Sequence, residues 1–133
     1  MPNPIRLALA ASLALALATI ARADDHTVQV AKSDRVGSYL TDAKGMTLYV
    51  FKKDSQGKSA CAGDCATHWP LYYREKVGVT GALNEADFGT ITREDGKKQT
   101  TYKGMPLYYF GGDKAPNDTK GNGVNKLWAV AAP

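Results

Sequence analysis

The sequence predicts a mostly β fold, in which a single small domain is made of two β-hairpin-containing pseudo-repeats with little helix. The first observation is an internal repeat: residues 44–54 align with residues 103–113 at an offset of 59 residues, and seven of eleven positions are identical. The same offset carries Trp69 onto Trp128, which a chance match of the first segment does not predict. In addition, both copies are short β-branched and aromatic runs between turn residues, with no helical period. The pseudo-repeats span about residues 37–73 and 88–131.

Each repeat is predicted to contain a hairpin. In the first repeat, residues 38–41 and 46–51 form the two strands, and Gly45 supplies the positive φ that the turn between them requires. The equivalent hairpin of the second repeat joins residues 99–103 to residues 105–110.

Two further strands are predicted in the second repeat. Residues 88–93 pair with residues 99–103 through a turn that contains Asp95-Gly96, a strong turn signal. The final strand covers residues 127–131 and places Trp128 and Val130 on one face. Helix is limited to single turns near residues 63–68 and 84–87.

The N-terminal segment has the pattern of a secretory signal peptide, residues 1–23. Arg6 is followed by an uncharged apolar run, residues 7–21, and by a small-x-small exit ending at Ala23. This run is too short to span a bilayer comfortably, and no later segment is apolar enough to do so. We therefore expect a mature domain of residues 24–133, periplasmic or secreted, with no membrane span after signal cleavage.

The charge balance argues against nucleic acid as a partner. Removing Arg6 and Arg22 from 17 Lys and Arg leaves 15, against 13 Asp and Glu, a net charge of +2. The lysine pairs at 52/53 and 97/98 each lie close to an aspartate, Asp54 and Asp95, and indicate either a solvated surface or a weak patch for an anionic partner. No nucleophile motif, phosphate loop or metalloprotease signature occurs, so no enzyme activity is expected.

Cys61 and Cys65, the two cysteines of the chain, are expected to form a disulfide in an oxidising compartment. A regular helix holds positions four apart too far away for a bridge, so a loop or distorted turn is required, and Gly63 permits one. The alternative is a copper or zinc site in the reduced chain, made of Cys61, Cys65 and His68 and supplemented by Met46, Met105 or His26.

Asp54 and Asp113 recur at the ends of matching strands, where a carboxylate can accept hydrogen bonds from turn amides. Equivalent placement in both repeats favours a structural role over catalysis. The tyrosines and the two tryptophans, Trp69 and Trp128, are expected in the core or in cross-strand pairs, with a ligand-lining face as the alternative.

These motifs carry a family resemblance. Two Tyr-x-Phe-x-x-Asp units, together with Cys61-x-Gly63-x-Cys65 and Trp69-Pro70, resemble the secreted-repeat family of bacterial predicted lipoproteins named for a Tyr-x-aromatic-x-x-Asp motif. The chain departs from that pattern in having no lipobox cysteine and in having Leu71 after Trp69-Pro70. The repeat-motif residues are Tyr49, Phe51, Asp54, Trp69, Tyr108, Phe110, Asp113 and Trp128.

The resemblance implies an exported protein but no particular activity. We therefore expect an exported envelope protein that is a non-catalytic binding or structural module, without a cofactor, whose partner is an unidentified envelope ligand or protein. The alternative is a periplasmic copper-handling or redox accessory protein that uses Cys61, Cys65 and His68. The sequence specifies no oligomeric state.

Overall fold

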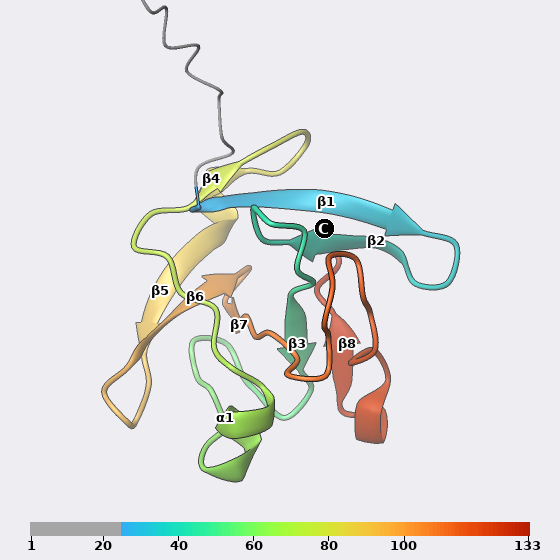
Figure 1. Ribbon diagram of the computed structural model, residues 1–133. Coiled ribbons are helices and arrows are strands. Elements are labelled where there is room, and N and C mark those ends of the chain that lie inside the picture. Colours follow the sequence, from blue (N-terminus) through green and yellow to red (C-terminus); the bar gives the residue numbers. More distant parts are fainter. Residues whose placement is uncertain (1–24) are drawn as a thin grey trace, which may run out of the picture.

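The computed structural model describes residues 25–133 (Figure 1). The predicted signal peptide, residues 1–23, lies outside the described residues. The strands are β1 (Thr27–Ser33), β2 (Gly37–Thr41), β3 (Tyr49–Phe51), β4 (Gly78–Val79), β5 (Phe88–Thr92), β6 (Lys98–Tyr102), β7 (Met105–Pro106) and β8 (Trp128–Val130). The helical elements are α1 (Asp64–His68) and two short 3-10 helices, η1 (Glu85–Asp87) and η2 (Val124–Lys126). The mostly β prediction is confirmed.

The strands form three small sheets, with the orders β2-β1-β4, β3-β8 and β5-β6-β7. Strands β1 and β2 lie across one end of the molecule, and α1 lies at the opposite end (Figure 1). Strand β1, which the sequence analysis did not predict, pairs with β2 in antiparallel register from Gln29 opposite Thr41 to Ser33 opposite Gly37. Val28 and Val30 lie on the same face of this strand, but only Val28 is buried, because the strand extends beyond the core after it.

The predicted turn after β2 forms around Asp42. Its carboxylate accepts hydrogen bonds from the amides of Lys44 and Met46, both at 2.9 Å, and Gly45 has a φ of +86°. The predicted strand over residues 46–51 is shorter than expected, because regular pairing begins only at Tyr49. Before Tyr49 the chain meets β2 through one isolated bridge, between Thr41 and Thr47.

The hairpin predicted between residues 88–93 and 99–103 is present as β5 and β6, in register from Phe88 opposite Tyr102 to Thr92 opposite Lys98. The hairpin predicted from 99–103 to 105–110 survives only as the two residues of β7, which pair with the end of β6. Beyond β7 the amide of Leu107 still donates to the carbonyl of Thr100 at 3.0 Å. Regular pairing ends because Tyr72 takes the other bonds: its amide donates to the Leu107 carbonyl and its carbonyl accepts the Thr100 amide, both at 2.9 Å.

The two repeats exchange their last strands. Strand β8 of the second repeat pairs in antiparallel register with β3 of the first, with Phe51 opposite Trp128. The equivalent segment of the first repeat, residues 68–72, runs along residues 107–111 of the second, where the amide of Gly111 donates to the carbonyl of His68 at 2.8 Å. Lys52 and Leu127, which stand 59 positions from Gly111 and His68 in the two repeats, make the same hydrogen bond, also at 2.8 Å.

The two repeats are therefore related by an approximate two-fold symmetry. At its centre, Tyr49 and Tyr108 exchange two backbone hydrogen bonds with each other, at 2.8 and 3.0 Å. Neither repeat completes its own pairing, so the two repeats fold as one unit.

The buried side chains form two clusters. One lies under β1 and β2 and contains mainly aliphatic residues, among them Val28, Leu40, Leu48 and Leu107. The other surrounds the strand exchange and contains Tyr49, Phe51, Cys61, Trp69, Tyr108 and Trp128. No helix within residues 25–133 is long and apolar enough to cross a bilayer.

Candidate functional site

The repeat motif pairs a tyrosine of each repeat with the aspartate of the other. The Tyr49 hydroxyl donates to Oδ2 of Asp113 at 2.6 Å, and the Tyr108 hydroxyl donates to Oδ2 of Asp54, also at 2.6 Å. We call these the two tyrosine–aspartate pairs. Their reciprocity explains why the motif residues recur at equal spacing in both repeats.

The second oxygen of each carboxylate holds a loop. Oδ1 of Asp54 accepts the amide of Ala60 at 2.6 Å, and Oδ1 of Asp113 accepts the amide of Lys120 at 3.0 Å. Burial, the largest influence, raises the pKa of both carboxyl groups, and these hydrogen bonds oppose that rise. Within the structure both aspartates therefore link strands to loops, as the strand-end positions indicated.

The same region contains four stacked rings. Trp69 and Trp128, which we call the tryptophan pair, lie parallel with their ring centroids 3.7 Å apart. Phe51 stacks on the outer face of Trp128 at 4.2 Å, and Phe110 covers Trp69 at 4.4 Å. In addition, Tyr49 makes an edge-on ring contact with Trp69, and Tyr108 makes one with Trp128. The rings predicted to lie in the core or in cross-strand pairs are thus assembled by the strand exchange.

The predicted disulfide between Cys61 and Cys65 is present, with the Cα atoms 5.3 Å apart. Cys61 lies before α1 and is buried, Cys65 lies within it, and Gly63 between them has a φ of +61°, so the bridge closes over a non-helical turn as expected. The exposed His68 ring makes a hydrogen bond through Nδ1 to the carbonyl of Asp64, at 2.9 Å.

No group of three or more His, Cys, Asp or Glu side chains in residues 25–133 is arranged to hold a metal ion. A bridged cysteine pair has no thiolate to offer. Copper or zinc binding by Cys61, Cys65 and His68 stays a prediction, and it concerns the reduced chain.

A cavity of about 570 Å³ opens between the end of α1 and the β5–β6 turn. Its apolar wall comes from Ala66, Pro70, Leu71 and Tyr73, and its charged wall comes from Arg93, Asp95, Lys97 and Lys98. We call it the Arg93 cavity. Its volume lies within the range of small-molecule sites.

Arg93 is fixed inside this cavity. Its side chain is 5% exposed, and its Nη1 donates to Oε1 of Gln99 at 2.7 Å while Nη2 donates to the carbonyl of Cys61. The remaining guanidinium nitrogen, Nε, is buried and has no hydrogen-bond partner within the described part of the chain. It faces the Asp95 carboxylate at 3.5 Å, across an ion pair whose acidic partner is 45% exposed.

Arg93 and Leu71 were not predicted as site residues, whereas Tyr73 is one of the tyrosines for which a ligand-lining face was the alternative. Lys97 and Lys98 beside Asp95 were predicted as an alternative patch for an anionic partner, and these residues do lie on the charged wall. One signal was available for Arg93: a lone arginine that ends a predicted strand directly before a Glu-Asp-Gly turn. Its bond to Cys61, 32 residues away, has no sequence signature.

The two sequence repeats exchange their last strands around a shared aromatic core. This arrangement defines the chain as a two-repeat β protein. Residues 30–72 and 89–132 match the model of a family described as a secreted repeat of unknown function. The chain therefore belongs to this secreted-repeat family, which confirms the resemblance carried by the motif residues. Neither the curated proteins nor the solved structures contain a match to the chain.

Proposed function

We propose that the chain is an exported, non-catalytic binding protein and that its ligand is a small anion with an apolar body, held in the Arg93 cavity. The observation that carries this proposal is a buried guanidinium, fixed by two hydrogen bonds, whose Nε hydrogen has no hydrogen-bond partner within the described chain. In the free protein the Asp95 carboxylate comes only to 3.5 Å from this buried donor, so a ligand anion that comes within hydrogen-bond distance stabilises it further.

The two walls of the cavity suit the two parts of such a ligand. Leu71, Pro70 and Tyr73 offer apolar surface for a hydrocarbon or aromatic body. Lys97 and Lys98 add positive charge at the rim, which steers an anion toward Arg93. A carboxylate or sulfonate has the geometry to accept from an arginine.

Asp95 holds the place of the ligand anion in the free protein. Its carboxylate accepts the amide of Lys97 at 2.9 Å and lies 3.5 Å from Nε of Arg93. Because Asp95 is nearly half exposed, it can swing toward solvent when a ligand anion arrives. The Asp95→Asn substitution keeps the turn acceptor and removes the competing charge.

The test uses anilinonaphthalene sulfonate as the probe, with uncharged N-phenylnaphthylamine as its apolar counterpart, both followed by fluorescence. We expect the sulfonate to bind more tightly. We expect Asp95→Asn to tighten sulfonate binding several-fold and Arg93→Gln to weaken it by about tenfold or more, since a charge-assisted hydrogen bond contributes on that scale. Binding of the uncharged probe should change little in either variant.

A matched control comes from the two lysine pairs. Replacing Lys97 and Lys98 by Met removes charge from the rim, whereas replacing Lys52 and Lys53 removes the same charge from exposed positions outside the lining of the cavity. Only the first double variant should weaken sulfonate binding. Equal affinities in the two double variants, together with an unchanged affinity in Asp95→Asn, would contradict the proposal.

A further inference from the structure

The aromatic rings at the strand exchange form a continuous series. The ring of Tyr49 contacts Trp69 with a centroid distance of 5.5 Å, Trp69 stacks on Trp128 at 3.7 Å, and Trp128 contacts Tyr108 at 5.1 Å. Tyrosine and tryptophan have the most easily oxidised aromatic side chains in proteins. Rings in contact at these distances allow an electron to pass from one to the next.

Both ends of the series carry a proton acceptor. The phenol groups of the two tyrosine–aspartate pairs donate to carboxylate oxygens at 2.6 Å. A phenol that loses an electron becomes a strong acid, and a hydrogen-bonded carboxylate can take its proton without any movement of the backbone. All four residues of these pairs are buried, with the tyrosines at 0% exposure and the aspartates at 8%, so water does not compete for that proton.

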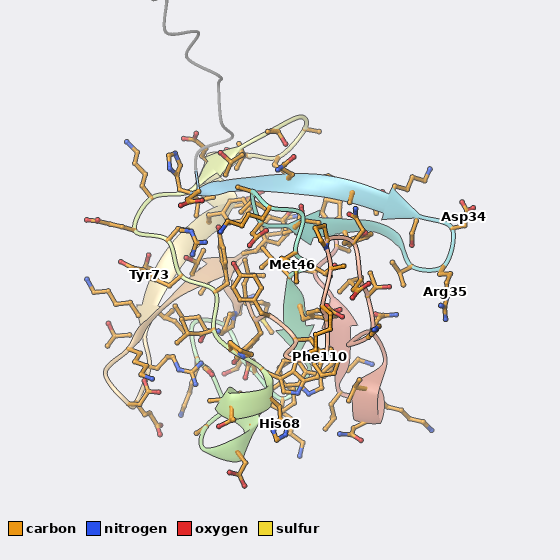
Figure 2. The ribbon with its side chains drawn as sticks, viewed as in Figure 1. Asp34, Arg35, Met46, His68, Tyr73 and Phe110 are labelled. Carbon is orange, nitrogen blue, oxygen red and sulfur yellow. A yellow bond between two sulfur atoms is a disulfide. The ribbon has the colours of Figure 1, made fainter. Side chains whose placement is uncertain are left out.

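The middle of the series borders a cavity, although both tryptophans are themselves buried, at 5% and 3% exposure. A second cavity, of about 370 Å³, is lined by Trp69 and Trp128 together with Phe110, Cys65 and His68. His68 and Phe110 lie at the end of the molecule that carries α1 (Figure 2). A small oxidant in this cavity therefore meets the tryptophan pair before it meets either buried tyrosine.

We propose that this Tyr-Trp-Trp-Tyr series is an electron relay that takes up one oxidising equivalent from a strong one-electron oxidant, such as a radical formed from peroxide, at the tryptophan pair. The oxidant gains one electron from a tryptophan, which becomes an indole radical cation. The adjacent tyrosine returns one electron to that indole and passes its phenol proton to its aspartate. The products are the reduced oxidant, a neutral tyrosyl radical and a protonated carboxyl group, with the tryptophan restored.

The experiment oxidises the protein with photogenerated ruthenium(III) trisbipyridine and follows the radicals by transient absorption and electron paramagnetic resonance. In the wild type we expect a tryptophan radical that decays as a tyrosyl radical rises, and we expect that step to slow in deuterated water. Tyr49→Phe or Tyr108→Phe alone should each slow the rise of the tyrosyl radical about twofold, because the tryptophan pair still contacts the other tyrosine. The double variant should lose the tyrosyl signal and keep a longer-lived tryptophan radical.

Tyr72→Phe is the matched control, because Tyr72 is fully buried but lies in the other cluster and its hydroxyl has no hydrogen-bond partner in the described chain. It should leave the tyrosyl yield unchanged. Circular dichroism checks that each variant is folded, and the wild-type kinetics stand even where a variant does not fold. A tyrosyl signal that persists in the folded double variant, or a wild-type tryptophan radical that decays without forming tyrosyl, would overturn the relay.

Discussion

The burial of phenol groups is the dominant electrostatic feature at the scale of single residues. Burial, the largest influence, raises the pKa of Tyr49, Tyr108 and Tyr109 well above the usual value, and each also donates to an aspartate, which raises it further. Burial raises the pKa of Tyr72 to about 12. These four groups keep their protons in the folded chain at a pH where the unfolded chain releases them.

This difference predicts that the protein loses stability in alkali. The folded-state pKa values are raised, so the folded chain binds more protons than the unfolded chain above about pH 10, and the free energy of unfolding falls as the pH rises. Each of the four tyrosines should lower that free energy by about 1.4 kcal/mol per pH unit above about pH 10. Urea denaturation at a series of pH values, with tyrosinate absorbance recorded in parallel, measures both quantities.

The four phenols should therefore ionise together, in the same transition that removes the native circular dichroism. Tyr108→Phe should lose stability less steeply in alkali than the wild type. An absorbance titration in which all seven tyrosines ionise near pH 10 while the fold stays intact would show that these phenols are not buried as described.

At the scale of elements, the disulfide turn and the β5–β6 turn are joined through one side chain. Arg93, which follows β5, donates to the carbonyl of Cys61, and Cys61 is bridged to Cys65 inside α1. The disulfide therefore does more than close a short loop, because it also fixes the acceptor that holds the guanidinium in the Arg93 cavity.

The Cys61→Ala/Cys65→Ala variant should be less stable than the wild type by about 2 kcal/mol, the chain-entropy value for a loop of about five residues. It should also bind anilinonaphthalene sulfonate more weakly, because the Cys61 carbonyl is no longer held in place. Urea denaturation and the fluorescence titration measure the two effects, and thiol labelling of the native protein should find no free cysteine. Two readily labelled thiols in the oxidised, folded protein would contradict this account.

The individual strands show which parts of the fold could be predicted from the sequence. The repeat located β3, the last strand and the paired aspartates, because side chains at equal spacing in two copies must serve equivalent positions. It could not show that β8 pairs with β3 of the other copy, because the alternation of a strand is the same whichever partner it has. Strand β1 was missed because it lies before the repeated segment, and Arg93 because its partner at Cys61 is fixed by the tertiary fold.

At the scale of the whole molecule, strand exchange makes the two repeats interdependent while leaving their surfaces different. The buried centre follows the two-fold relation closely, from the Tyr49–Tyr108 backbone pair to the stacked tryptophans. The disulfide breaks this relation, because the residues 59 positions after Cys61 and Cys65 are Lys120 and Val124. Arg93 breaks it as well, because the residue 59 positions before it is Asp34. The common core thus provides the scaffold, and the proposed binding site lies where the repeats diverge.

The most direct test of that binding site follows the nuclear magnetic resonance signal of the Arg93 Nε hydrogen while anilinonaphthalene sulfonate is titrated into the protein. The account predicts that the sulfonate shifts this signal, and the amide signals of Lys97 and Lys98, until the site is saturated. N-phenylnaphthylamine should leave the Arg93 signal unshifted. A titration in which the sulfonate shifts the indole signals of Trp69 and Trp128 while the Arg93 signal stays fixed would contradict the account.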